Sequence, residues 1–145
     1  MPSVDAHLRA AETHVAAYES MTDGFAGWKA VMLFYAAVHY VEAVFACSDT
    51  HFSLHCDREN ELMKKHRAIW AQYLRLRNES EKARYLAPRH LAHAPDQEWR
   101  KLSFALTDND VKVALYEKRL KAIIDYCMPI IKVYQQKTAA KVKAT

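Results

Sequence analysis

Residues 25–46, FAGWKAVMLFYAAVHYVEAVFA, decide the fold of this chain. The stretch is apolar on almost every side at helical period, so a helix formed by it has to be surrounded by other helices. Tyr35, His39 and Glu42 nevertheless recur along one stripe of the same helix. The apolar run between Lys29 and His39 has only about half of the roughly 20 residues that a membrane span needs. We therefore expect a buried core helix.

The composition indicates one helical domain with a hydrophobic core of its own. The chain has 145 residues and only two glycines, which disfavours β-rich folds and excludes a glycine-rich phosphate loop. The net charge of +4 permits a polyanionic partner without requiring one. Three cysteines without framework spacing, and a start that lacks an apolar leader, predict a cytoplasmic protein that does not enter a membrane.

Periodic apolar residues predict two helices in the first third of the chain. The first runs from an N-cap at Ser3 to about Ser20. A Thr-Asp-Gly break follows, and Asp23 is expected to cap the second helix, which ends near Cys47.

A third helix is expected to begin at an Asp57 cap and to run without interruption to Tyr85 or Leu86, because Pro88 prevents much further extension. Its apolar seam consists of Leu62, His66, Ile69, Tyr73, Leu76, Ser80 and Ala83. Residues 87–106 then read as a long loop, and a connection of that length in a compact domain is often functional.

Thr107 and Asp110 resemble a capping box, which predicts the start of the last helix. The expected seam of this helix is Val113, Tyr116, Leu120, Ile123, Cys127, Ile130 and Tyr134. Three apolar residues outside that line, together with the face of the second helix, are candidates for a dimer interface: Ile124, Ile131 and Val133.

Four long helices joined by mostly short links predict an all-α fold, an antiparallel up-and-down bundle of four to five helices. The bundle is expected to occupy residues 1–137 as a single domain. The remaining basic residues, 138–145, are expected to form a frayed tail.

Three segments, residues 34–45, 55–60 and 77–85, together resemble the HEPN superfamily of nucleotide-binding helical bundles. Many members carry aromatic-Tyr-Ala-Ala-x-His-x-x-Glu-Ala in the second helix, His-x-x-Arg at the start of the third and Ser-x-x-Ala-Arg-Tyr at its end. The matching residues here are Tyr35, His39, Glu42, His55, Arg58, Ser80, Ala83, Arg84 and Tyr85. The resemblance covers roughly residues 25–86.

The resemblance implies a homodimer associated with RNA or nucleotides, in some systems beside a separate nucleotidyltransferase or within a toxin–antitoxin or defence pair. Active members cleave RNA without metal through an Arg and a His before the last helix, which correspond here to Arg84 and His90. Tyr85 directly after the arginine and Pro88 within the segment depart from the active pattern. A non-catalytic binding or scaffold version is therefore favoured, with a metal-independent endoribonuclease as the alternative.

Two groups of residues are candidates for binding phosphate or a nucleotide. The expected pocket residues are Tyr35, His39, Glu42, His55, Arg58, Tyr85 and Arg89. Basic residues also gather in and beside the long loop: Arg84, Arg89, His90, His93, Arg100 and Lys101. His39 has an alternative interpretation as a core histidine bonded to a tyrosine or a backbone carbonyl.

Cys47, His51, His55 and Cys56 are zinc-ligand types at short spacing. All four would have to fold into one tetrahedron across a helix end, with His90 or His93 as the only nearby additions. We therefore expect no metal ion and no other cofactor.

Overall fold

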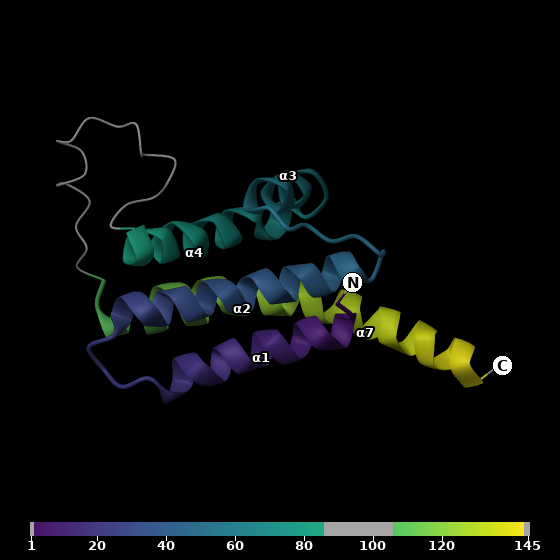
Figure 1. The fold of residues 1–145 in the computed structure, drawn as a ribbon, viewed down its shortest axis with the longest axis horizontal. Coiled ribbons are helices and arrows are strands. Elements are labelled where there is room, and N and C mark those ends of the chain that lie inside the picture. The colour runs from purple at the N-terminus through teal and green to yellow at the C-terminus, as the bar shows by residue number, and fades with distance from the viewer. Residues whose placement is uncertain (1, 86–105, 144–145) are drawn as a thin grey trace.

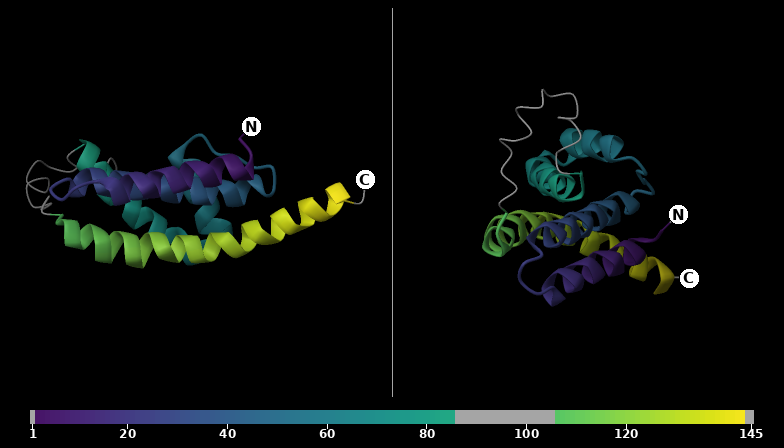
Figure 2. Two further views of the ribbon diagram at one scale, coloured as in Figure 1. Left: turned by 90° about the horizontal axis from the view of Figure 1, so that it is seen from below. Right: turned by 60° about the vertical axis from the view of Figure 1, so that its left-hand side comes forward.

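The computed structural model describes residues 2–85 and 106–143 of the chain. All secondary structure in these residues is helical, which confirms the all-α class. The elements are α1 (Val4–Ser20), α2 (Ala26–Ala46), α3 (His55–Lys65), α4 (Arg67–Tyr85), α6 (Asp108–Asp110), η2 (Val111–Leu120) and α7 (Lys121–Lys143). The last three form one continuous rod. Figures 1 and 2 show this rod, α1, α2 and α4 lying lengthwise alongside one another, with α3 set at an angle beside the start of α4.

Helix α2 is the centre of the core, as its apolar sequence predicts. It contacts α1, α4, η2 and α7, and Leu33, Phe34 and Val41 on it are almost completely inaccessible to solvent. By length and composition alone α2 would suffice to cross a membrane, but 83% of its most apolar window is buried inside the protein. Burial against neighbouring helices therefore accounts for the composition of α2.

The N-terminal boundaries of α1 and α2 are set in different ways. Ser3 caps α1 as predicted, because its hydroxyl accepts a hydrogen bond from the Ala6 amide at 3.2 Å. The prediction that Asp23 caps α2 is wrong, since the N-cap residue is Phe25 and no side chain caps the helix. Asp23 instead lies 3.2 Å from the ammonium group of Lys29, so its charge neutralises a lysine on the core helix.

Lys29 connects the start of α2 to the start of the last helical rod. It is only 7% exposed, and its ammonium group lies 2.6 Å from a carboxylate oxygen of Asp108. The other oxygen of Asp108 accepts a hydrogen bond from the Gly24 amide at 2.8 Å. Gly24 has a φ of 93°, a left-handed conformation that suits glycine at this turn. The buried lysine is thus paired with two carboxylates that lie nearer the surface.

The prediction of one uninterrupted third helix is wrong, because the helix is broken at His66. This residue has φ −130° and ψ 43°, and its ring nitrogen Nδ1 lies 3.0 Å from the hydroxyl of Tyr126 on α7. Leu62 before the break and Ile69 after it are both buried. The apolar periodicity therefore continues across the break, and the sequence pattern gives no sign of it. The first part also starts earlier than expected, with Leu54 rather than Asp57 at the N-cap.

The capping box at the start of the last rod is confirmed, since Thr107 and Asp110 exchange hydrogen bonds between side chain and backbone. The seam beyond it differs from the prediction. Its buried members are Val111, Leu115, Leu120, Ile123, Cys127 and Ile131. Val113, expected inside, is 49% exposed. The cause is the π-helical segment η2, whose wider turn places residues four and five positions apart on the buried face: Val111, Leu115 and Leu120.

Two expectations about the end of the chain change as a result. Ile131 is fully buried and therefore cannot contribute to a dimer surface, whereas Val133 is half exposed. The tail expected from residue 138 is helical as far as Lys143 and extends past the other helices (Figure 2). The predicted loop over residues 87–106 lies outside the described residues except for its last position.

The π-helical register can be tested by two truncations. We expect Leu115→Ala to lower the free energy of unfolding by about 2 to 5 kcal/mol, because it empties a buried position. Val113→Ala should change it by less than about 0.5 kcal/mol. Urea denaturation measures both. An ordinary α-helical seam through Val113 would give the opposite order.

The contact between Asp108 and Lys29 makes part of the stability depend on pH. The hydrogen bond from the Gly24 amide, and then the one from Lys29, lower the pKa of Asp108 below its ordinary value of 3.8. A carboxyl whose pKa is lower in the folded state stabilises the fold above the unfolded pKa, and that contribution is lost as the pH falls through the folded pKa.

Asp108→Asn should therefore lower the thermal midpoint at pH 7 and narrow the difference between the midpoints at pH 7 and pH 3. Differential scanning calorimetry at the two pH values measures this. Asp125→Asn, at an exposed position on α7, is the matched control and should leave the difference as it is. An unchanged difference in Asp108→Asn would contradict the assignment.

Candidate functional site

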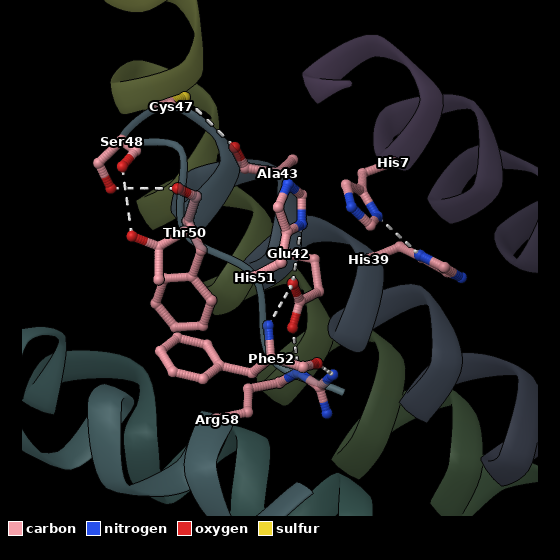
Figure 3. Close-up of polar contacts among 11 residues, drawn as sticks. His7, His39, Glu42, Ala43, Cys47, Ser48, Thr50, His51, Phe52 and Arg58 are labelled. Carbon is pink, nitrogen blue, oxygen red and sulfur yellow. Dashed lines mark hydrogen bonds and ion pairs between the residues drawn. The ribbon is translucent and has the colours of Figure 1, made fainter. Parts of the chain in front are cut away.

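A buried ion pair joins α2 to α3. Glu42 and Arg58 are each 4% exposed, and the guanidinium Nε of Arg58 donates to Glu42 Oε1 at 2.6 Å. Arg58 also donates to the carbonyl of Phe52 at 2.5 Å, and the Phe52 amide faces Glu42 Oε2 at 3.4 Å. The Glu42 carboxylate thus binds both Arg58 on α3 and the Phe52 backbone in the segment that connects α2 to α3 (Figure 3).

Histidines lie on the other side of Glu42. His51 Nδ1 is 3.6 Å from Glu42 Oε2. His7, on α1, shares a hydrogen bond with His39 through their Nδ1 atoms at 3.2 Å. One ring nitrogen of His7, one of His51 and a carboxylate oxygen of Glu42 all lie within 4.8 Å of one another. Figure 3 shows Glu42 between the ring of His51 and the guanidinium of Arg58, with His7 beside them.

The histidines belong to a longer row of rings on α1 and α2. The ring centroids of Tyr35 and His14 are 5.7 Å apart, those of His14 and His39 5.5 Å, those of His39 and His7 5.5 Å, and those of His7 and His51 5.4 Å. Burial lowers the pKa of His7, of His14 and of His39, which keeps these imidazoles neutral near pH 7. A row of neutral rings can pack closely without repulsion between charges.

Arg84 lies at the opposite end of this row. Its Nη1 donates to the hydroxyl of Tyr35 at 3.0 Å, and its guanidinium carbon is 5.5 Å from the centre of the Tyr35 ring. Its Nε also faces the carbonyl of Ser80 at 3.4 Å. A residue from the motif of the second expected helix and one from the motif at the end of the third are thus in direct contact.

A cavity of about 280 Å³ lies beside Arg84. It is lined by Ser53, Leu54, His55, Cys56, Arg77, Glu81 and Arg84. His55 and Cys56 are the first two residues of α3, and the N-cap residue Leu54 before them offers no side-chain hydrogen bond to the first amides of the helix. The cavity therefore combines arginine side chains with a helix N-terminus.

Arg77 and His55, which also line this cavity, are engaged in hydrogen bonds and ion pairs. Arg77 donates to Glu81 at 2.9 Å and also pairs with Glu59. His55 accepts a hydrogen bond from Arg58 at 3.0 Å. Burial, and then the neighbouring arginines, lower the pKa of His55, so its ring is neutral at pH 7.

The expected site residues that the structure describes fall into two groups. Tyr35, His55 and Arg84 lie at or beside the cavity, while His39 and Glu42 lie along the histidine row, with Arg58 bridging the groups. His39 is bonded to another histidine rather than to a tyrosine or a carbonyl. The side chain of Tyr85 and the remaining expected residues lie outside the described part of the chain: Arg89, His90, His93, Arg100 and Lys101.

The sequence analysis did not predict that His7, His14 and His51 belong to one cluster of rings. His7 and His14 are one heptad apart on α1, a spacing that places both on one helix face and was the available signal. Cys47, His55 and Cys56 do not join His51. The Cys47 thiol donates to the Ala43 carbonyl at 3.2 Å, and Cys56 is exposed.

Comparison with protein-family models, with curated proteins and with solved structures finds no match to this chain. A function therefore has to be inferred from the chemistry of the residues themselves.

A double-mutant cycle can measure the coupling free energy between Arg58 and Glu42. We expect Arg58→Met to lower the free energy of unfolding by about 3 to 5 kcal/mol, because it leaves Glu42 charged and buried. Combining it with Glu42→Met should cost less than the sum of the single variants by about 0.5 to 3 kcal/mol. The pair Lys65–Glu61 on α3, whose lysine is exposed, is the control, with an expected coupling of about 0.3 to 0.5 kcal/mol. Equal coupling in both pairs would contradict a buried, structure-determining contact.

Proposed function

We propose that this chain is a non-catalytic HEPN-like module that binds phosphate groups of RNA or nucleotides in the cavity beside Arg84. The observation that carries the proposal is the meeting of Arg84 with the open N-terminus of α3 in one cavity. Guanidinium groups and free helix amides are the two protein groups best suited to phosphate oxygens.

Arg84 is held in place for this role. The Tyr35 hydroxyl and the Ser80 carbonyl both accept a hydrogen bond from its guanidinium, which fixes the position of the side chain. A guanidinium positioned in advance loses less side-chain freedom on binding a ligand. The first-turn amides of α3 add the positive end of the helix dipole on another wall of the cavity.

The volume of the cavity limits the ligand. About 280 Å³ is slightly below the range of about 300 to 1,000 Å³ that is typical of sites enclosing whole small molecules. A phosphate with part of its ribose would fill it, and the base would remain outside. We therefore propose recognition of the sugar–phosphate backbone with little base preference.

The proposal includes the arrangement and assembly that the family resemblance implies. The helices would form an antiparallel up-and-down bundle, and two copies would pair as a cytoplasmic homodimer, with a separate nucleotidyltransferase as a further partner. Val133 is half exposed and Ile124 is partly exposed, so both remain candidates for the surface between the copies. Sedimentation that shows a strict monomer would remove the dimer from the proposal.

Binding can be measured by fluorescence anisotropy with a short single-stranded RNA and with ATP, each in the presence of a chelator. Arg84→Ala should weaken binding by about 10- to 100-fold, because hydrogen bonds to charged groups contribute about 1.5 to 3 kcal/mol. Arg75→Ala is the matched control, since Arg75 lies on the same helix but is exposed and paired with Glu79. It should weaken binding by less than threefold.

Two results would overturn the proposal. Equal affinity of wild type and Arg84→Ala would remove the cavity as the binding site. Cleavage of the RNA by the wild type in chelator, abolished by His90→Ala, would establish the alternative endoribonuclease instead.

A further inference from the structure

We propose that His7, Glu42 and His51 form a binding site for a divalent transition-metal ion, with Zn²⁺ as its representative. The residues come from α1, α2 and the connection between α2 and α3. The site lies apart from the cavity beside Arg84 and does not depend on the function proposed there. It also departs from the expectation, drawn from sequence, that the chain holds no metal.

The three ligand atoms are close to coordination distance. Atoms bound to one tetrahedral ion lie about 3.3 Å apart when each bond is about 2.0 Å long. The pair His51 Nδ1 and Glu42 Oε2 is already at 3.6 Å, and all three ligand atoms fall within 4.8 Å. The longest of these separations therefore has to shorten by about 1.5 Å at most. His51 follows the end of α2 in an irregular segment, where such an adjustment disturbs no helix.

His7 gives an independent indication of a ligand. The residue is only 8% exposed, and its Nε2 atom is buried with no hydrogen-bond partner among the described residues. Buried polar atoms in folded proteins almost always have a partner, and a bound ion or water often satisfies an atom that no protein group reaches. Figure 3 shows the ring nitrogen that does not face His39 directed toward His51 and Glu42.

The surroundings of these ligands resemble those of known metal sites. When His7 Nδ1 donates its proton to His39, the lone pair is left on Nε2, where a metal would bind. Arg58 holds Glu42 Oε1, whereas Oε2 accepts only a long hydrogen bond of 3.4 Å from the Phe52 amide, so Oε2 is the oxygen that can bind an ion. Both arrangements orient a ligand through a hydrogen bond behind it, as metal sites generally do.

Access to the site is available from solvent. His51 lines an open groove of about 740 Å³, which is also bordered by Asp5 and Asp49. These two carboxylates outnumber the one lysine that lines the groove, Lys143, and so favour the approach of a cation. Two imidazoles and one carboxylate are a ligand set for Zn²⁺, Co²⁺ or Fe²⁺ rather than for Mg²⁺ or Ca²⁺, and three protein ligands leave a coordination position for water.

Tag-free protein, stripped with a chelator and dialysed, provides the test. Titration with Co²⁺, followed by its visible absorption spectrum, should show one ion per chain, and Zn²⁺ should displace it. Zn²⁺ should also raise the thermal midpoint, because the ion binds only the folded arrangement. Mg²⁺ at the same concentration should do neither.

Substitutions of single residues can test which side chains bind the metal ion. His51→Gln should weaken binding by at least about 100-fold, since loss of outer partners alone weakens metal sites by about 10- to 100-fold. His7→Gln should do the same. His14→Gln is the matched control, because it removes a neighbouring imidazole on α1 that has no atom in the cluster. Cys56→Ser removes the exposed thiol, an alternative zinc ligand, and should leave binding unchanged.

Three outcomes would overturn the proposal. One is the absence of Co²⁺ and Zn²⁺ binding to the stripped wild type. Another is equal affinity in His51→Gln and wild type, and the third is loss of binding in Cys56→Ser alone. Should His7→Gln fail to fold, His51→Gln still decides, provided that its circular dichroism in chelator matches the wild type.

Discussion

The structure depends above all on one buried carboxylate, that of Glu42. An ionised side chain inside an apolar helix bundle is costly unless charges and hydrogen-bond donors surround it. Arg58 meets one oxygen at 2.6 Å, while His51 and the Phe52 amide lie against the other. This requirement draws α3 and the preceding connection onto α2. The position of α3 and of this connection, in turn, sets the position of residues in both candidate sites.

Helix α2 contributes residues to both candidate sites, the cavity beside Arg84 and the cluster of His7, Glu42 and His51. Toward Arg84, Tyr35 supplies a hydroxyl and a ring face. Toward His7, His39 supplies a ring nitrogen inside a row of imidazoles kept neutral by burial. At one end α2 therefore positions the guanidinium of Arg84, on α4, for an anionic ligand, and at the other end it supplies the Glu42 carboxylate to the proposed metal site. The two proposals use different residues and can fail separately.

The fold class and several boundaries were predictable because local signals determine them. A serine N-cap and a capping box act over three residues, and the apolar run of α2 leaves burial as the favourable outcome in water. The break at His66 was not predictable, because it depends on a contact with Tyr126, 60 residues away in sequence. The π-helical turn was missed for a related reason. A period of about 3.6 residues per turn places Val113 inside, whereas the wider turn buries Leu115.

The candidate site was predictable only in part, for physical reasons. Tyr35 and Arg84 follow from motifs, and their contact brings together residues 49 positions apart. His7 and His51 carry no such motif, and only packing of α1 against α2 places their nitrogens beside Glu42. Pairwise side-chain geometry of this kind cannot be obtained from periodicity, which specifies a helix face but not the neighbour that covers it.

The way α3 is attached has a consequence for its motion. Only Arg58 and Leu62 on this helix are buried, so one buried ion pair and one aliphatic side chain attach it to the core, and a further ion pair, Glu59 with Arg77, links it to α4. A segment with so few buried groups opens at a lower free energy than the whole protein unfolds, as a separate cooperative unit. The break at His66 allows such opening without unwinding α4. Ions that screen charge, or a ligand held at the start of α3, would therefore shift this local equilibrium while the other helices stay folded.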